Sequence, residues 1–254
     1  MKDQIHIEKL PNAPLKEVVF EMHWKLDVDK ESGLLLDRDF PLASGKFDSL
    51  ANQSLTFYER LVPDVLPYNF FSHKAIHRYW KSANEYPVMQ LGPGLFTVND
   101  TEKKYVWKDF KKTIFEGIKW LRESYRDRLN LDFIELHYID AVQIPDDLNV
   151  LPDFFKKSLK ININNNIPLP SNKFSGFQLI QKYKLENGNN LNLVFNNAEQ
   201  GVENILVWRN SISKQGGIKM ESLEAWVEDA HTACSLLFKN MISEELYEQF
   251  KRKN

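Results

Sequence analysis

Residues 18–26, VVFEMHWKL, decide the fold, because apolar and polar side chains alternate along them. The residues that share one side are Val18, Phe20, Met22, Trp24 and Leu26. This period of two is typical of a strand with one buried face. The same alternation returns in residues 134–144, IELHYIDAVQI, and predicts an equivalent strand in the second half of the chain.

Each of these strands is followed, later in the chain, by a long amphipathic helix. Within residues 104–126 an apolar stripe recurs at helical spacing through Phe110, Ile114, Gly117, Ile118, Leu121 and Tyr125. The final long helix carries Leu223, Trp226, Val227, Ala230, Cys234, Leu237 and Met241 on one side. We therefore predict an α+β fold with a mostly antiparallel sheet. We also expect two related β-rich halves, residues 1–130 and 131–254, each closed by one helix packed on the sheet. The alternative is one compact unit.

Three further segments have recognisable patterns. Residues 47–60 predict a modest helix that ends before Pro63. Residues 177–185 and 191–195 alternate on either side of Asn187-Gly188, which predicts a β-hairpin. The asparagine-rich residues 161–170 are typical of a loop.

Composition narrows the class of protein. The 33 Lys and Arg residues nearly balance the 35 Asp and Glu residues, so no overall charge favours nucleic acid or an anionic membrane. A single cysteine, Cys234, excludes an internal disulfide and suits a reducing compartment. No apolar run approaches the roughly 20 residues that span a bilayer. We expect a soluble cytoplasmic protein.

Five segments, in this order along the chain, resemble a known family: PLKEVVFE (14–21), PVMQLGPGLFTVN (87–99), YVWKDF (105–110), LHYID (136–140) and AHTACSLLF (230–238). They are similar to a sporadically distributed bacterial family of about this length that has no assigned function. Sporadic occurrence implies an accessory gene of the kind found in phage-defence or toxin–antitoxin loci. The family commonly has asparagine where this chain has Asp140.

Asp140 is the most unusual residue of the second predicted strand. Alternation sets it on the same side as Leu136, Tyr138 and Val142, where it should be buried. A buried carboxylate needs a partner or takes up a proton. One interpretation is a general base or a ligand contact. The other is a bulge that turns it outward, or a structural bond to an arginine or a backbone amide.

The predicted helix 104–126 is the other candidate binding site. Basic residues lie beside its apolar stripe, and Trp120 offers a ring on which a base could stack. Interleaved acids such as Asp109 and Glu123 favour the alternative of a solvated helix flank. A protein partner would also use tryptophan and arginine as anchors. The residues expected to bind are Lys108, Lys112, Lys119, Trp120, Arg122 and Asp140.

Motifs for catalysis and metal binding are missing. His73 and His77 are four residues apart, but neither a glutamate after His73 nor a nearby cysteine completes a zinc site. Gly92-Pro93-Gly94 lies between two predicted strands, which does not suit a dinucleotide loop. We expect no catalytic residue, metal or cofactor.

We therefore expect a non-enzymatic protein-interaction module, antitoxin-like or an accessory component of a bacterial defence system, whose protein partner is encoded nearby. The first alternative is a nucleic-acid or nucleotide binder that uses helix 104–126. The second is an enzyme with a site around Asp140 and the segment of His73 and His77.

Overall fold

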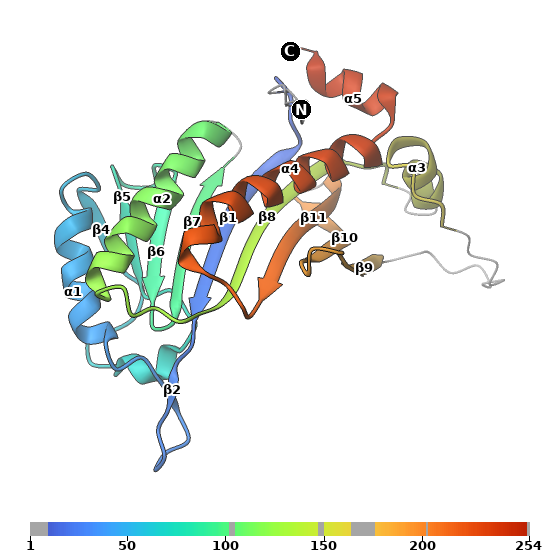
Figure 1. Cartoon of the computed structure of the whole chain (residues 1–254). Coiled ribbons are helices and arrows are strands. Elements are labelled where there is room, and N and C mark those ends of the chain that lie inside the picture. The colour runs from blue at the N-terminus through green and yellow to red at the C-terminus, as the bar shows by residue number, and fades with distance from the viewer. Residues whose placement is uncertain (1–9, 102–104, 147–149, 164–175, 202, 253–254) are drawn as a thin grey trace. The chain divides into compact units, whose positions relative to one another are not determined.

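A computed structural model describes residues 10–101, 105–146, 150–163, 176–201 and 203–252 (Figure 1). The strands are β1 (Leu15–Trp24), β2 (Asp27–Val28), β3 (Leu35–Leu36), β4 (Phe57–Arg60), β5 (His77–Trp80), β6 (Val88–Gly92), β7 (Leu95–Thr101), β8 (Leu131–Gln143), β9 (Gln178–Lys184), β10 (Asn190–Gln200) and β11 (Glu203–Gln215). The helices are α1 (Phe40–Ala51), α2 (Trp107–Ser124), α3 (Leu151–Ser158), α4 (Leu223–Met241) and α5 (Glu244–Lys251), with short 3₁₀ turns η1 (Tyr68–Phe71) and η3 (Met220–Ser222). Helices combined with a large antiparallel sheet confirm the predicted α+β class.

The chain divides into two compact units, each discontinuous in sequence. The β1 unit comprises Glu17–Leu136 and Ser213–Val227, and its strands follow the order β4-β5-β6-β7-β1-β8. The β10 unit comprises the described parts of Met1–Lys16, His137–Ile212 and Glu228–Asn254, with the order β8-β11-β10-β9. The relatedness of residues 1–130 and 131–254 stays a prediction, because compactness does not test common origin.

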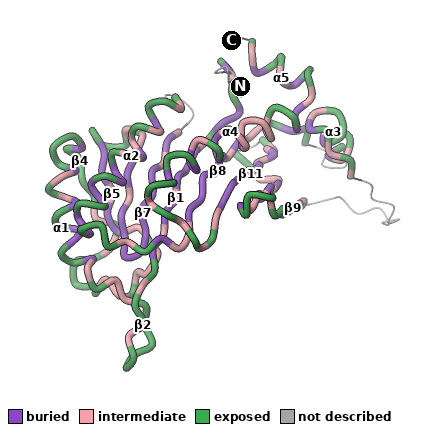
Figure 2. The backbone as a smooth tube through the Cα atoms, in the orientation of Figure 1, coloured by how far each residue is buried: buried purple, intermediate pink, exposed green. Residues whose placement is uncertain are grey.

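In the β1 unit, the apolar side of β1 is buried as its alternation predicts. Phe20 and Met22 have no exposed surface, and antiparallel pairing with β7 sets them opposite Val98 and Phe96. Phe47 of α1 packs against the Phe96 ring, with 6.1 Å between centroids. Figure 2 shows the buried residues along these strands and exposed residues on the outer sides of the helices. The helices therefore cover one face of the sheet.

Two helix glycines in this unit have opposite surroundings. A Cβ added to Gly117 of α2 would lie about 2.3 Å from Cζ of Phe96, whereas one added to Gly45 of α1 would meet nothing within 4 Å. We expect Gly117→Ala to lower the free energy of unfolding by about 1–2 kcal/mol through overpacking, and Gly45→Ala to raise it by about 0.5–1 kcal/mol. Urea unfolding measures both. Changes of the same sign would contradict the packing of α2 on β7.

The helix predicted over residues 47–60 is wrong in position. Helix α1 begins earlier, at Phe40, and its buried Phe40, Ala43, Phe47 and Ala51 recur at helical spacing. Phe57–Arg60 instead form β4, which pairs antiparallel with β5. Hydrogen bonding to a strand about 20 residues away therefore outweighs the local helical preference.

The β10 unit confirms the predicted hairpin. Strands β9 and β10 pair antiparallel on either side of a turn in which Gly188 has a φ of 79°. The unit's core gathers aromatic side chains from α3, β10, β11 and α5: Phe155, Phe195, Trp208 and Phe250. Helix α5 begins after Ser243, whose Oγ accepts a hydrogen bond from the Leu246 amide at 3.2 Å. Most of the predicted loop 161–170 lies outside the described residues.

The apolar stripes predicted for the long helices are also buried. All six members in α2 and at its end are buried. In α4, Leu237 alone of the seven predicted residues is only partly buried.

Candidate functional site

The predicted basic side of α2 is on the surface, but its tryptophan is not. The exposed residues are Lys108, Lys112, Lys119 and Arg122. Trp120 is only 9 % exposed, and its ring meets the Phe47 ring edge-on with 6.0 Å between centroids. This corrects the expectation that Trp120 offers a ring for base stacking, because the ring belongs to the packed side of the helix.

Lys119 and Arg122 line a cavity of about 460 Å³ between α2 and the start of α4. The same cavity is lined by four acidic residues: Glu123, Asp127, Glu221 and Glu224. Arg122 Nε also lies 2.7 Å from Oδ1 of Asp127. Two cations among four carboxylates do not favour phosphate groups. Nucleic-acid or nucleotide binding by this helix stays a prediction.

Asp140 is buried on β8, on the side that its alternation predicts, with 4 % of its surface exposed. The backbone bond from Ile144 N to Asn204 O sets the antiparallel register, which places Asp140 opposite Trp208 of β11. Burial raises the pKa of Asp140 to about 7, and the Trp208 indole N–H lowers it in part. The buried indole nitrogen nevertheless makes no well-formed hydrogen bond. Burial is therefore the larger effect on Asp140.

The polar neighbour of Asp140 differs from the partners that the sequence suggested. Its polar neighbour is an indole, where the sequence suggested an arginine or a backbone amide. Asp140 also belongs to the β10 unit, whereas the basic residues of α2 belong to the β1 unit. Its role as a base or ligand contact stays a prediction.

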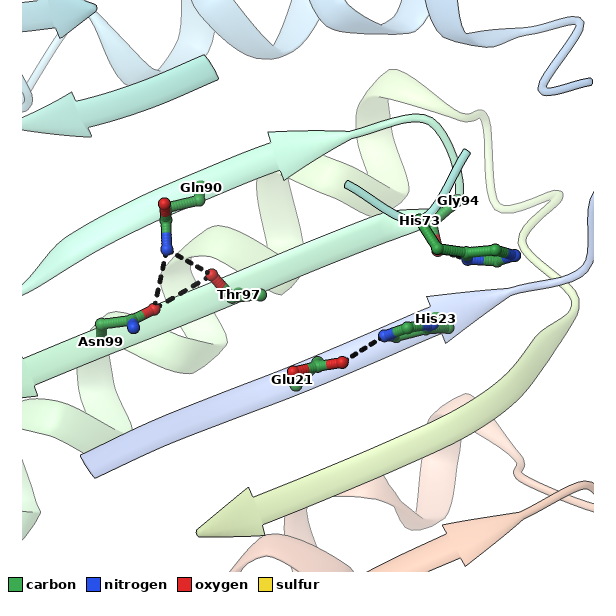
Figure 3. Close-up of polar contacts among 7 residues, drawn as sticks. All are labelled: Glu21, His23, His73, Gln90, Gly94, Thr97 and Asn99. Carbon is green, nitrogen blue, oxygen red and sulfur yellow. Dashed lines mark hydrogen bonds and ion pairs between the residues drawn. The ribbon is translucent and has the colours of Figure 1, made fainter. Parts of the chain in front are cut away.

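A polar network that the sequence analysis missed crosses the other face of the sheet in the β1 unit (Figure 3). Gln90 of β6 donates from Nε2 to Oγ1 of Thr97 and to Oδ1 of Asn99, both at 3.1 Å. Asn99 donates in turn from Nδ2 to Oε1 of Glu17 at 2.7 Å. These side chains alternate with buried apolar ones, so they lie on the face opposite α1 and α2. We call Glu17, Arg78, Gln90, Thr97 and Asn99 the polar face.

Arg78 of β5 is held in place by this network. Because Gln90 donates its amide hydrogens to β7, its Oε1 remains to accept from Arg78 Nε at 2.9 Å. Glu59 of β4 is a looser neighbour, 3.6 Å from Arg78 Nη1, and both side chains are partly exposed. Among the described residues Arg78 makes no other side-chain hydrogen bond or ion pair. Most of its donors therefore remain available.

A cavity of about 130 Å³ adjoins Arg78, and its walls include Trp80, Tyr86 and Asn99. Phe57 of β4 pairs directly with Trp80 and meets its ring edge-on, with 5.9 Å between centroids. Phe57 is 44 % exposed and Tyr86 is 38 % exposed. We call Phe57, Trp80 and Tyr86 the aromatic rim. It lies at the edge of the sheet, because β4 has a single neighbouring strand among the described residues.

Two histidines close one end of the same face (Figure 3). The rings of His23 and His73 stack with 4.9 Å between centroids, and His23 Nε2 lies 2.5 Å from Oε1 of Glu21. His73 Nδ1 lies 3.1 Å from the Gly94 carbonyl oxygen, so this nitrogen carries the proton. Burial first, and the charge of His23 second, lower the pKa of His73. The hydrogen bond from His73 to Gly94 ties the β6–β7 turn to the segment of His73.

Two other kinds of feature are absent from the described residues. No group of three or more histidine, cysteine or acidic residues is placed there to hold a metal ion. None of the described helices is both long enough and apolar enough to cross a membrane.

Comparison with known proteins adds little. No family model matches the chain, and no curated protein matches it. The crystal structure of the di-domain ARO/CYC StfQ from the steffimycin biosynthetic pathway is similar at 11 % sequence identity, over 83 % of this chain and 94 % of that chain. Its TM-score is 0.19, and at this value the similarity carries no argument about this chain.

Proposed function

We propose that the chain is a non-enzymatic protein-interaction module that binds its partner at the edge strand β4 and the aromatic rim. One observation carries the proposal: the exposed Phe57 and Tyr86 lie beside the half-exposed Arg78, next to the edge of β4 that pairs with no other strand among the described residues. Aromatic residues and arginine contribute most of the binding energy at protein interfaces. An open strand edge can also receive the backbone of a partner.

The segment after β4 supports the same location. Val65 and Phe70 are 87 % and 61 % exposed. Their segment is shaped locally, because the Arg60 guanidinium lies 5.2 Å from the centre of the Tyr68 ring and the Leu61 amide bonds to the Ile76 carbonyl at 2.9 Å. Exposed apolar groups on an ordered segment are typical of an interaction surface.

The finer role that we propose is that of an antitoxin-like protein or an accessory component of a bacterial defence system. It rests on the family resemblance of residues 14–21, 87–99, 105–110, 136–140 and 230–238. The partner would then be encoded by a neighbouring gene, and the complex would act in the cytoplasm.

Site-specific photocrosslinking in the native host tests the proposal. A benzophenone amino acid at position 57 should give a discrete protein adduct, because Phe57 lies within the surface proposed to contact the partner. The matched control is position 183, where Tyr183 is 51 % exposed on β9 of the other unit. Mass spectrometry of the adduct identifies the partner, including a second copy of this chain.

Equal adducts at positions 57 and 183, or none at position 57, would contradict the proposed surface. Turnover of a nucleotide or nucleic acid by the purified chain would contradict the non-enzymatic assignment.

A further inference from the structure

We infer that the cavity beside Arg78 is a carboxylate-binding site, and that it receives the side chain of an aspartate or glutamate of the partner. The source of the carboxylate rests on the proposed function. The chemistry of the site rests on the polar face alone.

The guanidinium of Arg78 is oriented before any ligand arrives. Arg78 Nε donates a hydrogen bond to Gln90 Oε1 at 2.9 Å. Gln90 is itself fixed by two hydrogen bonds from its Nε2 to side chains of β7, each of 3.1 Å. Asn99 extends the network to Glu17 of β1, so four strands share in fixing one side chain. An arginine with a fixed plane and free donors matches the two oxygens of a carboxylate.

The size of the cavity limits what can enter. Pockets for drug-sized ligands and cofactors measure about 300–1,000 Å³, and this cavity measures about 130 Å³. It therefore suits the end of one side chain. Trp80 and Tyr86 in its wall can contact the methylene groups behind the carboxylate.

The acidic neighbours favour a carboxylate over a phosphate. Glu17 lies in the cavity wall, and Glu59 lies 3.6 Å from Nη1 of Arg78. Both carboxylates repel an incoming anion, and they repel a doubly charged phosphate more than a singly charged carboxylate. The single guanidinium therefore selects the smaller charge.

Titration of the ¹⁵N-labelled full chain, followed by NMR, tests this site. The probes are N-acetylglutamic acid α-amide, the matching glutamine amide as a neutral control, glutarate as a free dicarboxylate, and inorganic phosphate. We expect the glutamate amide to shift the Arg78 Nε–H and Trp80 indole signals saturably. The glutamine amide should leave both signals in place.

Three variants sharpen the test. Arg78→Lys keeps the charge but loses the planar fork, so it should weaken binding of the glutamate amide at least about tenfold. Glu59→Gln removes a competing carboxylate and should strengthen binding about threefold. The control is Arg38→Lys, because Arg38 is an exposed arginine, 3.3 Å from Asp27, outside the polar face. It should leave the affinity unchanged.

The outcomes separate this inference from the proposed function. Unchanged affinity in Arg78→Lys with the remaining spectrum intact, or equal shifts with the glutamate and glutamine amides, would overturn the site. Tighter binding of phosphate than of any carboxylate would also overturn it. Glutarate binding at least about tenfold tighter than the glutamate amide would support the site's chemistry but remove a partner side chain as its source.

Discussion

Replacing Asp140 by asparagine should raise the free energy of unfolding at pH 8 by roughly 4 kcal/mol. Burial raises the pKa of Asp140 in the folded chain to about 7, from an ordinary value of 3.8. Each unit of pKa shift corresponds to about 1.4 kcal/mol. Ionisation of the carboxyl therefore lowers the free energy of unfolding by about 1.4 kcal/mol for each unit of the shift. Asparagine has nearly the same shape and no charge.

The pH dependence of this gain follows from the sign of the shift. The folded carboxyl holds its proton up to about pH 7, whereas the unfolded one releases it near pH 3.8. Asp140 alone therefore lowers the stability of the wild-type chain as pH rises from about 4 to 7, and its effect is constant above that range. Urea unfolding of both proteins at pH 8, 6 and 4 should show a difference that shrinks towards zero at pH 4. A difference that is absent at pH 8, or equally large at pH 4, would contradict the buried position of Asp140.

The wild type must be compared with Asp140→Asn, because His77 also titrates in this pH range. Burial lowers the pKa of this histidine to about 4, so its contribution to stability is present above pH 6.5 and is lost as pH falls towards 4. Its Nδ1 lies 2.7 Å from the Tyr58 hydroxyl oxygen. The His77 and Asp140 effects have opposite slopes between about pH 4 and 6.5. The wild-type profile should therefore be nearly flat in this range, while the stability of Asp140→Asn rises as pH rises from about 4 to 6.5.

The second large effect is expected from Gly92→Ala, which should lower the free energy of unfolding by about 3 kcal/mol. A Cβ on Gly92 would lie about 1.8 Å from the Lys74 carbonyl oxygen, which is part of the backbone. That segment cannot shift freely, because the His73 amide bonds to Pro93 O at 2.8 Å and the Ile76 amide bonds to Leu91 O at 2.9 Å. Chemical unfolding of the purified variant measures the loss.

Gly45→Ala is the control for this substitution, because its Cβ meets nothing within 4 Å. Spectra of Gly92→Ala should also show a change at the His23 and His73 rings, whose stacking depends on the same turn. Stability equal to that of the wild type, with both histidine signals unchanged, would contradict the close approach of residues 73–76 to the β6–β7 turn.

The parts of the fold with a strong period could be predicted from the sequence. The alternation around Phe20 and the stripe through Ile114 each gave the correct element and the correct buried side. Strand β4 could not be predicted, because Phe57–Arg60 is short and forms by pairing with residues 77–80. Its identity depends on that distant partner.

The polar face was missed for a related reason. Within residues 87–99, Gln90, Thr97 and Asn99 alternate with apolar residues, and this alternation is the signal in the sequence for a second, polar face. Nothing in the sequence shows that Gln90 lies opposite Thr97, or that Arg78 lies opposite Gln90. Only the register of four strands brings these side chains together. The burial of Asp140 could be predicted, because it follows from the alternation of apolar and polar residues along one strand and requires no knowledge of the register between strands.

Hydrogen exchange of the chain, alone and in complex with the captured partner, is the most direct test of binding at β4 and the aromatic rim. We expect slower exchange of the backbone amides of residues 57–60 in the complex, because the proposed partner covers the exposed edge of β4 and the aromatic rim. Exchange in residues 178–184 of β9 should not change. Protection confined to α2 and its exposed Lys108, Lys112 and Lys119, with no effect at residues 57–60, would contradict binding of the partner at β4.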